Sequence, residues 1–193
     1  IKRNILIIFK QPTFFMNTVL TLIVPVILFP VMFFTGELSM DVLNSPQFKA
    51  YMPLIFSGLL VSPAIISNIS ATAIAREGQS FWETKVMPIS SAENIKYRIY
   101  TSIGFNFLGT LLLLILGSIF LPVTINIIIP ALIVAITANL FFSTIDIIIN
   151  IYRPLLEWTN PTAAVKNNLN VMISLGIRAV IGINCYGLYF IFP

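Results

Sequence analysis

No Asp, Glu, Lys or Arg occurs in residues 99–145, "IYTSIGFNFLGTLLLLILGSIFLPVTINIIIPALIVAITANLFFSTI". Two other uncharged stretches cover residues 11–36 and 50–75. A helix of about 20 apolar residues crosses the hydrocarbon core of a bilayer, so uncharged stretches of this length are typical of transmembrane helices. The whole chain is 58% hydrophobic and 9% charged, whereas soluble domains are about 45–50% apolar and about 25% charged. The sequence therefore indicates a polytopic membrane protein.

The uncharged stretches predict an all-α fold in which residues 1–193 form one transmembrane domain. Strands are not expected, because the stretches lack the alternating segments of about ten residues that build membrane barrels. A turn at Pro122 is expected to join the third and fourth helices. The five predicted spans are residues 13–35, 51–75, 97–121, 123–149 and 171–192.

The basic residues gather in three segments that alternate spans place on one side of the membrane. They are Lys2, Arg3 and Lys10 before the first span, Arg76, Lys85, Lys96 and Arg98 after the second, and Arg153 and Lys166 after the fourth. Lys and Arg concentrate in cytoplasmic loops, so the N-terminus is predicted to be cytoplasmic. The net charge of +4 follows from these loops, and no nucleic-acid partner is expected.

The loop after the second span is unusually charged, and its residues 76–98 hold seven of the eighteen charged side chains. Gly78 suits a C-cap for the second span. Ser80 and Glu83 have the spacing of a capping box, which would open a short helix over residues 81–87. Ser90 and Glu93 have the same spacing and would open the third span.

The short helix carries Phe81 and Trp82 beside Lys85. Amphipathic helices with aromatic and basic residues belong at an interface, with either lipid headgroups or a protein. One interpretation is an ordinary charged loop that an interfacial aromatic residue anchors. The other is a docking helix for a cytoplasmic partner, because aromatic residues are common in interface hot spots.

Three segments carry a resemblance to a known family. They are "IAREGQSFWETKVMPISSAENI" at residues 74–95, "RPLLEWTNPTAAVKNNLN" at residues 153–170 and the opening "IKRNILIIFKQPTFFMN". Together they resemble the cytoplasmic loops, the elbow helix and the first span of bacterial ATP-binding-cassette transporter permeases of the type-2 exporter class. The three segments comprise 57 of the 193 residues.

This resemblance implies a permease in the bacterial cytoplasmic membrane that works with a separate ATPase subunit and a second permease half. The loop after the second span would be the coupling helix, which sits in a groove of the ATPase. The positions that carry over are Arg76, Glu77, Gly78, Phe81, Trp82 and Lys85. The family half has six spans where this chain has five predicted spans, so we expect the chain to be part of a longer permease.

The segment between the fourth and fifth spans forms a second cytoplasmic candidate, with Arg153, Trp158, Asn160 and Lys166 as its named residues. Asn160 followed by Pro161 is a typical helix start, with Asn as N-cap and Pro at the first helical position. Trp158 would anchor at the level of the headgroups. A simple interfacial return into the fifth span and a second ATPase contact are both open.

Arg178 is predicted to lie inside the fifth span, where burying an Arg costs at least about 2.5–3.5 kcal/mol. It would either snorkel to the cytoplasmic headgroups, which is the simpler interpretation, or face a water-filled translocation path. Asp146 is expected at the membrane interface. Asn106, Asn139 and Asn184 would connect helices, and the small residues Ser67, Ala71 and Ala75 would permit close helix packing.

Signals for catalysis are weak. The chain has no His and one Cys, and it lacks the G-x-x-x-x-G-K-[ST] loop that binds ATP. We therefore expect no catalytic residue, no metal site and no cofactor in this chain. Besides the permease hypothesis, a secondary transporter or channel and a membrane enzyme or assembly factor stay open, and the substrate is not readable from the sequence.

Overall fold

The computed structural model describes residues 1–191, with the side chains of Met40 and Phe190 left out. Most of these residues are helical, which confirms the predicted all-α membrane fold. The elements are α1 (Lys2–Lys10), α2 (Pro12–Phe34), α3 (Met40–Asn44), α4 (Pro46–Ile66), η1 (Gly78–Ser80), α5 (Phe81–Val86), α6 (Ser91–Phe120), α7 (Ile125–Tyr152), α8 (Pro161–Val165) and α9 (Leu169–Ile191).

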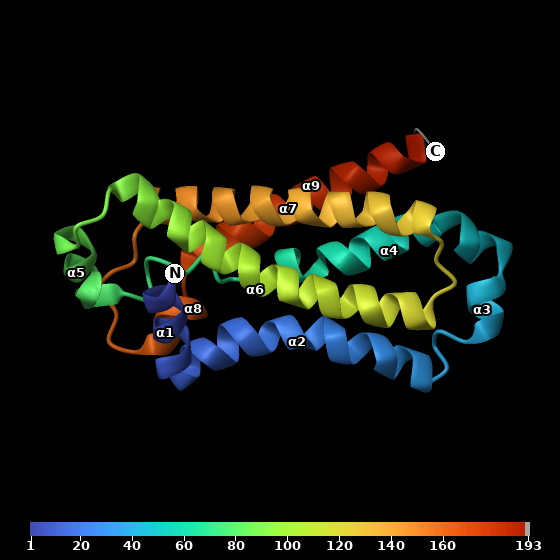
Figure 1. Cartoon of the computed structure of the whole chain (residues 1–193), viewed down its shortest axis with the longest axis horizontal. Helices are drawn as coiled ribbons and strands as arrows, with labels where there is room; N and C mark the ends of the chain where they lie inside the picture. Colours follow the sequence, from blue (N-terminus) through green and yellow to red (C-terminus); the bar gives the residue numbers. More distant parts are fainter. Residues whose placement is uncertain (192–193) are drawn as a thin grey trace.

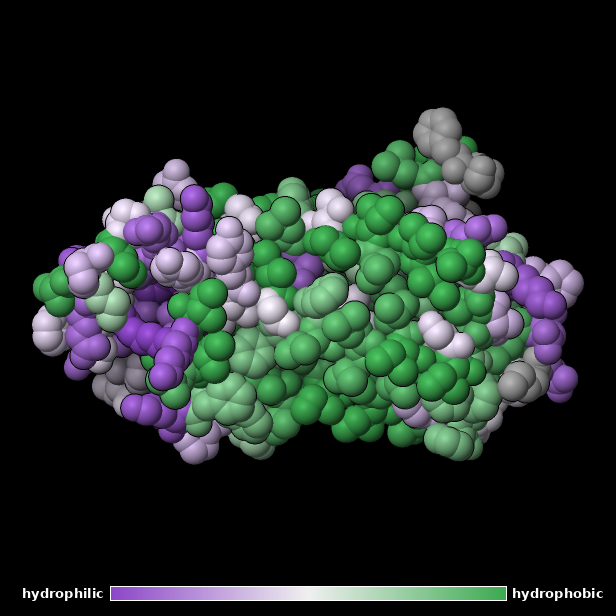
Figure 2. Space-filling view, in the orientation of Figure 1, coloured by the Kyte–Doolittle hydropathy of each residue, from purple (hydrophilic) through white to green (hydrophobic). Residues whose placement is uncertain are grey.

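Within the described residues, five helical segments are long and apolar enough to cross a membrane, namely α2, α4, α6, α7 and Pro161–Tyr189, which includes most of α9. They run along the long axis of an elongated bundle (Figure 1). On the face that Figure 2 shows, apolar side chains cover the middle of the bundle, and hydrophilic side chains gather at its two ends. This distribution is the one that a bilayer requires, because the apolar band faces the hydrocarbon.

One end of the bundle carries α1, α5 and α8, and we call it the basic end (Figure 1). The three basic segments of the sequence meet there, as predicted. The opposite end carries α3, whose first turn contains Asp41. Assignment of the basic end to the cytoplasm stays a prediction of the positive-inside rule.

This orientation can be tested with two single cysteines in a Cys185→Ser background. Glu37→Cys lies beside α3 and Ser80→Cys lies at the basic end, and both positions are exposed. We expect a membrane-impermeant thiol reagent to label Glu37→Cys from outside intact cells and Ser80→Cys only after the membrane is opened. Labelling of both positions from the same side would contradict the topology.

Apolar residues close the bundle between α4 and α6. Phe56 and Leu113 are fully buried there. Two glycines of α6 allow this helix to lie close to α4. A Cβ at Gly117 would lie 2.8 Å from the Phe56 ring, and one at Gly109 would lie 3.1 Å from Pro63. Small residues at such crossings let helix backbones come close, and van der Waals packing then holds the helices together.

Local signals explain several helix starts. The Ser90 hydroxyl accepts the Glu93 N–H at 3.2 Å, and the Glu93 carboxylate accepts the Ser90 N–H at 3.0 Å, so the predicted capping box of α6 is confirmed. Asn160 accepts the Thr162 N–H at 2.9 Å and caps α8 as predicted. Gln11 is extended and Pro12 opens α2, which separates α2 from the elbow helix α1.

The second span differs from the prediction. It begins earlier, at Pro46, and ends at Ile66 rather than at residue 75. Residues 67–77 form a run of turns instead of a helix, and most of them are buried. The expected helix-packing repeat of Ser67, Ala71 and Ala75 is therefore wrong. Gly78, with φ of +52°, ends this run of turns and does not cap the span.

The predicted capping box at Ser80 is also wrong. Ser80 belongs to the 3-10 turn η1, and its ψ of 3° is turn-like. An N-cap side chain reaches the first N–H groups of a helix from an extended backbone, so Ser80 makes no such bond. The short helix itself is confirmed, because α5 covers Phe81–Val86.

Candidate functional site

The exposed part of the predicted coupling segment is the helix α5. Trp82 is 63% exposed and Val86 is 70% exposed, although both are large apolar side chains. Phe81 is half-buried, and the Lys85 ammonium lies 5.8 Å from the centre of its ring. The apolar surface that α5 offers to a partner therefore consists of Trp82 and Val86, with Lys85 beside it.

Arg76, Glu77 and Gly78 are buried, so the six predicted coupling residues do not share one surface. Glu77 connects two helices through ion pairs. Its Oε1 lies 2.6 Å from Arg98 Nη2 of α6, and its Oε2 lies 2.9 Å from Arg3 Nη2 of α1. Thr84 of α5 donates a further hydrogen bond to Oε2 at 2.5 Å. One buried carboxylate therefore fastens α5 to the elbow helix and to a transmembrane helix.

Trp158 makes a second connection at the basic end. Its indole N–H donates to the carbonyl of Ala75 at 2.7 Å, and its ring meets Phe14 edge-on at 6.0 Å between centroids. The ring also covers Gly78, where an added Cβ would lie 2.8 Å from it. Trp158 therefore joins the segment after the fourth span to the segment after the second span. Its level relative to the lipid headgroups stays a prediction.

The other residues of the second cytoplasmic candidate are exposed. Arg153, Asn160 and Lys166 all lie at the basic end, with Asn160 occupied as the cap of α8. The backbone carbonyl of Arg153 accepts a hydrogen bond from Asn170 at 2.8 Å, which closes the turn into α9. A contact of Arg153 and Lys166 with an ATPase stays a prediction.

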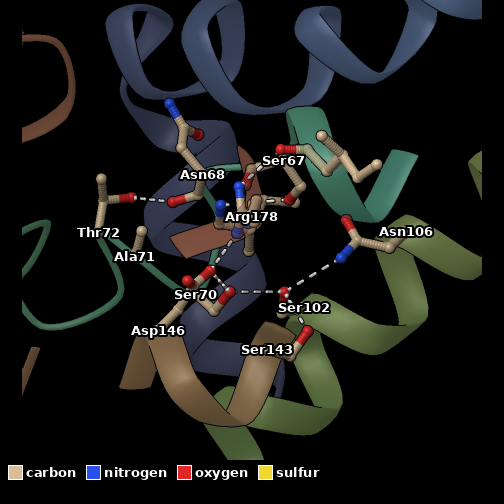
Figure 3. A network of polar contacts seen from close by, with 12 residues as sticks. Ser67, Asn68, Ser70, Ala71, Thr72, Ser102, Asn106, Ser143, Asp146 and Arg178 are labelled. Carbon is tan, nitrogen blue, oxygen red and sulfur yellow. Dashed lines mark hydrogen bonds and ion pairs between the residues drawn. The ribbon is translucent and has the colours of Figure 1, made fainter. Parts of the chain in front are cut away.

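Inside the bundle, a polar network surrounds the broken end of α4 (Figure 3). Arg178 of α9 is 4% exposed and Asp146 of α7 is 1% exposed. The two side chains form an ion pair of 2.5 Å, and Ser70 donates to the same Asp146 oxygen at 2.7 Å. The snorkelling interpretation of Arg178 is therefore wrong, because its guanidinium is buried and paired inside the bundle. A translocation path beside Arg178 and an interfacial depth of Asp146 stay predictions.

Arg178 also explains why α4 stops. Its Nη1 donates to the backbone carbonyls of Ile65 at 2.7 Å and Ser67 at 2.8 Å. In a continuing helix these carbonyls would accept N–H groups four residues later. Asn150 of α7 likewise donates to the carbonyls of Ser70 and Ala71. Irregular backbone inside a membrane is tolerated where the protein satisfies it, and here α7 and α9 supply the donors.

Further side chains extend the network across α6 and α7. Ser102 lies 3.3 Å from Ser70 and 3.1 Å from Ser143, measured between hydroxyl oxygens. Asn106 donates to Asn139 at 2.9 Å, which confirms the predicted role of these two residues between helices. Asn184 differs, because its side chain is exposed and bonds to Val180 of its own helix.

Sequence reasoning missed the network as a unit. Its signal was the group Ser67, Asn68, Ser70 and Thr72 in an otherwise apolar stretch. Such residues bond to nearby backbone groups and so compete with helix formation. The partners on α7 and α9 are distant in sequence, so the pattern alone did not reveal the pairing.

In the part of the chain that the structure describes, no three His, Cys, Asp or Glu side chains cluster as a metal site would require. Comparison with protein-family models, with curated proteins and with solved structures finds no match to this chain. The fold and the apolar band therefore define the class, a multi-pass helical membrane protein. Its finer function rests on the geometry and on the sequence resemblance.

Proposed function

We propose that the chain is the membrane-spanning permease subunit of an ATP-driven exporter, working with a separate ATP-binding-cassette ATPase and a second permease half. The observation that carries the proposal is that α5 is exposed on one side and anchored at its base. Its outer face exposes Trp82 and Val86, while Glu77 at its base is buried and paired to Arg3 and Arg98. An exposed apolar helix with a rigid base is suited to receive a partner and to transmit its movement.

The proposed coupling follows the buried contacts. A force on α5 acts on Glu77, and the ion pair with Arg98 carries it to α6, a candidate membrane span. The pair with Arg3 carries it to the elbow helix α1, which leads directly into α2. Buried charge pairs suit this task, because separating them leaves an uncompensated charge and is strongly unfavourable.

The docking surface can be tested with Trp82→Ala combined with Val86→Ala. We expect the double variant to insert and fold normally but to lose co-purification of the ATPase by at least about tenfold, since truncating hot-spot residues often costs about 2 kcal/mol or more. Mass spectrometry would identify the co-purified protein by its ATP-binding loop. Tyr152→Ala is the matched control, because Tyr152 is 83% exposed at the same end. Equal co-purification with the double variant and the control would exclude α5 as the docking helix.

A secondary transporter or channel is the second candidate function. The buried Arg178–Asp146 pair and the largely buried non-helical residues 67–77 after α4 favour it, because charges and non-helical backbone inside a membrane often mark a substrate or ion pathway. The two candidates differ in their energy source. Transport in sealed vesicles driven by an ion gradient without ATP would favour the second candidate.

A further inference from the structure

A pocket of about 420 Å³ lies at the basic end between α1, the start of α2 and the η1–α5 segment. Its charged lining consists of Arg3, Lys10 and Arg76 together with Glu77 and Glu83. Glu77 is already paired to two arginines, one of them Arg3. The remaining charges are Lys10 and Arg76 against Glu83, which is exposed. The unpaired charge of the pocket is therefore positive.

Arg76 is the unusual member of this lining. It is 6% exposed, and its Nη1 donates to Thr72 Oγ1 at 2.5 Å. Among the described side chains no carboxylate lies within ion-pair distance of it, whereas the buried Arg98 and Arg178 each have one. A buried charge without a partner is costly, so an anion in the pocket would complete the site.

The protonation of Arg76 agrees with this geometry. Burial, together with the nearby positive charge of Arg98, lowers the pKa of Arg76 to about 9, although Glu77 acts in the opposite direction. The guanidinium is still charged at neutral pH. An anion bound beside it would relieve both causes of the lowered pKa, because it would replace lost solvation and compensate the second arginine.

The surroundings indicate what kind of anion fits. The other wall of the pocket is apolar and includes Leu6, Phe14 and Trp158. Leu6 belongs to α1, which also exposes Phe9 and carries Lys2 and Lys10 at its ends. A helix of this composition lies in the plane of the headgroups with its apolar face in the membrane. Basic pockets at the cytoplasmic surface of transmembrane helices are typical sites for anionic headgroups.

We propose that this pocket binds an anionic phospholipid. Arg76 and Lys10 would contact the phosphate of the headgroup, and Leu6, Phe14 and Trp158 would contact the apolar part of the lipid. The site goes beyond the proposed transport function and does not depend on an ATPase. It joins α1 to the loop that precedes α5, so an occupied pocket would stabilise the basic end.

The test measures the thermal unfolding midpoint of the delipidated protein against added lipid. Phosphatidylglycerol is expected to raise the midpoint in a saturable way, and phosphatidylcholine is not. Arg76→Gln and Lys10→Gln should each weaken the apparent affinity for phosphatidylglycerol about fivefold, the effect of one basic residue near an anionic surface. Lys96→Gln is the control, since Lys96 is exposed on α6 and outside the lining of the pocket. Without lipid, Arg76→Gln should be as stable as the unmodified protein or more so, because it removes an unpaired buried charge.

Four results would overturn the proposal. Equal stabilisation by both lipids would exclude a headgroup site. An equal loss of phosphatidylglycerol affinity in Lys96→Gln would show that general surface charge, and not this pocket, attracts the lipid. Stabilisation by millimolar inorganic phosphate alone, blocked by Arg76→Gln, would assign the pocket to a free anion. An unchanged lipid response in both pocket variants, combined with loss of the co-purified ATPase, would make Arg76 a contact of the partner protein. Lys10 is exposed, so its variant is informative even if Arg76→Gln does not fold.

Discussion

Arg178→Leu is expected to destabilise the protein by about 3–5 kcal/mol, because it breaks a buried ion pair and leaves one charge without its partner. Asp146 would keep its hydrogen bond from Ser70 but lose its cation. The carbonyls of Ile65 and Ser67 would lose the donor that replaces their helical bonds. Unsatisfied buried acceptors add about 1–3 kcal/mol each. The thermal unfolding midpoint in detergent should therefore fall strongly.

The partner variant and the combination of both distinguish a specific pair from general sensitivity. Asp146→Asn should also destabilise, because Arg178 then remains charged and buried. The double variant Arg178→Leu with Asp146→Asn should lose clearly less stability than the sum of the losses in the two single variants. Such non-additivity is the sign of a direct interaction. Asn184→Leu is the control on the same helix, since Asn184 is exposed. Additive losses would contradict the pairing.

Glu77→Gln is expected to separate docking from coupling. The change keeps the size of the side chain but removes the charge that Arg3 and Arg98 share. Trp82 stays exposed on α5, so an ATPase should still co-purify. The connection from α5 to α1 and α6 should be loosened, because Arg98 would be a buried charge without a carboxylate. ATP hydrolysis by the ATPase should then no longer respond to the presence of this chain.

Two further variants keep this prediction testable. Glu83→Gln is the matched control, since Glu83 is an exposed carboxylate on the same short helix. Arg3→Gln removes one of the two ion pairs, and the Arg3 side chain is 28% exposed. It should fold even if Glu77→Gln does not, and it should weaken coupling by less. Normal coupling in both Glu77→Gln and Arg3→Gln would show that the carboxylate is a local structural contact only.

Much of the fold was predictable because its signals are local. Uncharged stretches of sufficient length predicted the first four spans, and the apolar residues around Arg178 predicted the fifth. The cap at Ser90 and the Asn160-Pro161 helix start each depend on residues within four positions, and both were predicted. The short helix α5 was found for the same reason, although the cap assigned to Ser80 was wrong because a 3-10 turn precedes it.

The remaining features depend on contacts between distant segments. The second span ends at Ile66 because Arg178 and Asn150 take the carbonyls that would extend it. Hydropathy continues to residue 75 and gives no sign of this competition. The hydrogen bond from Trp158 to the carbonyl of Ala75 was not predicted either, because an isolated Trp favours the headgroup level and gives no sign of this partner. Trp158 lies 83 positions from Ala75, and Arg178 lies 113 positions from Ile65.

The most direct measurement of the proposed function is ATP hydrolysis in lipid vesicles that contain the chain and its co-purified ATPase. We expect the unmodified chain to change the hydrolysis rate relative to the ATPase alone. The variant Trp82→Ala with Val86→Ala should lose this effect together with binding, whereas Glu77→Gln should lose the effect while binding persists. If the hydrolysis rate with the unmodified chain and with each of the two variants equals the rate of the ATPase alone, α5 does not couple an ATPase to these membrane helices.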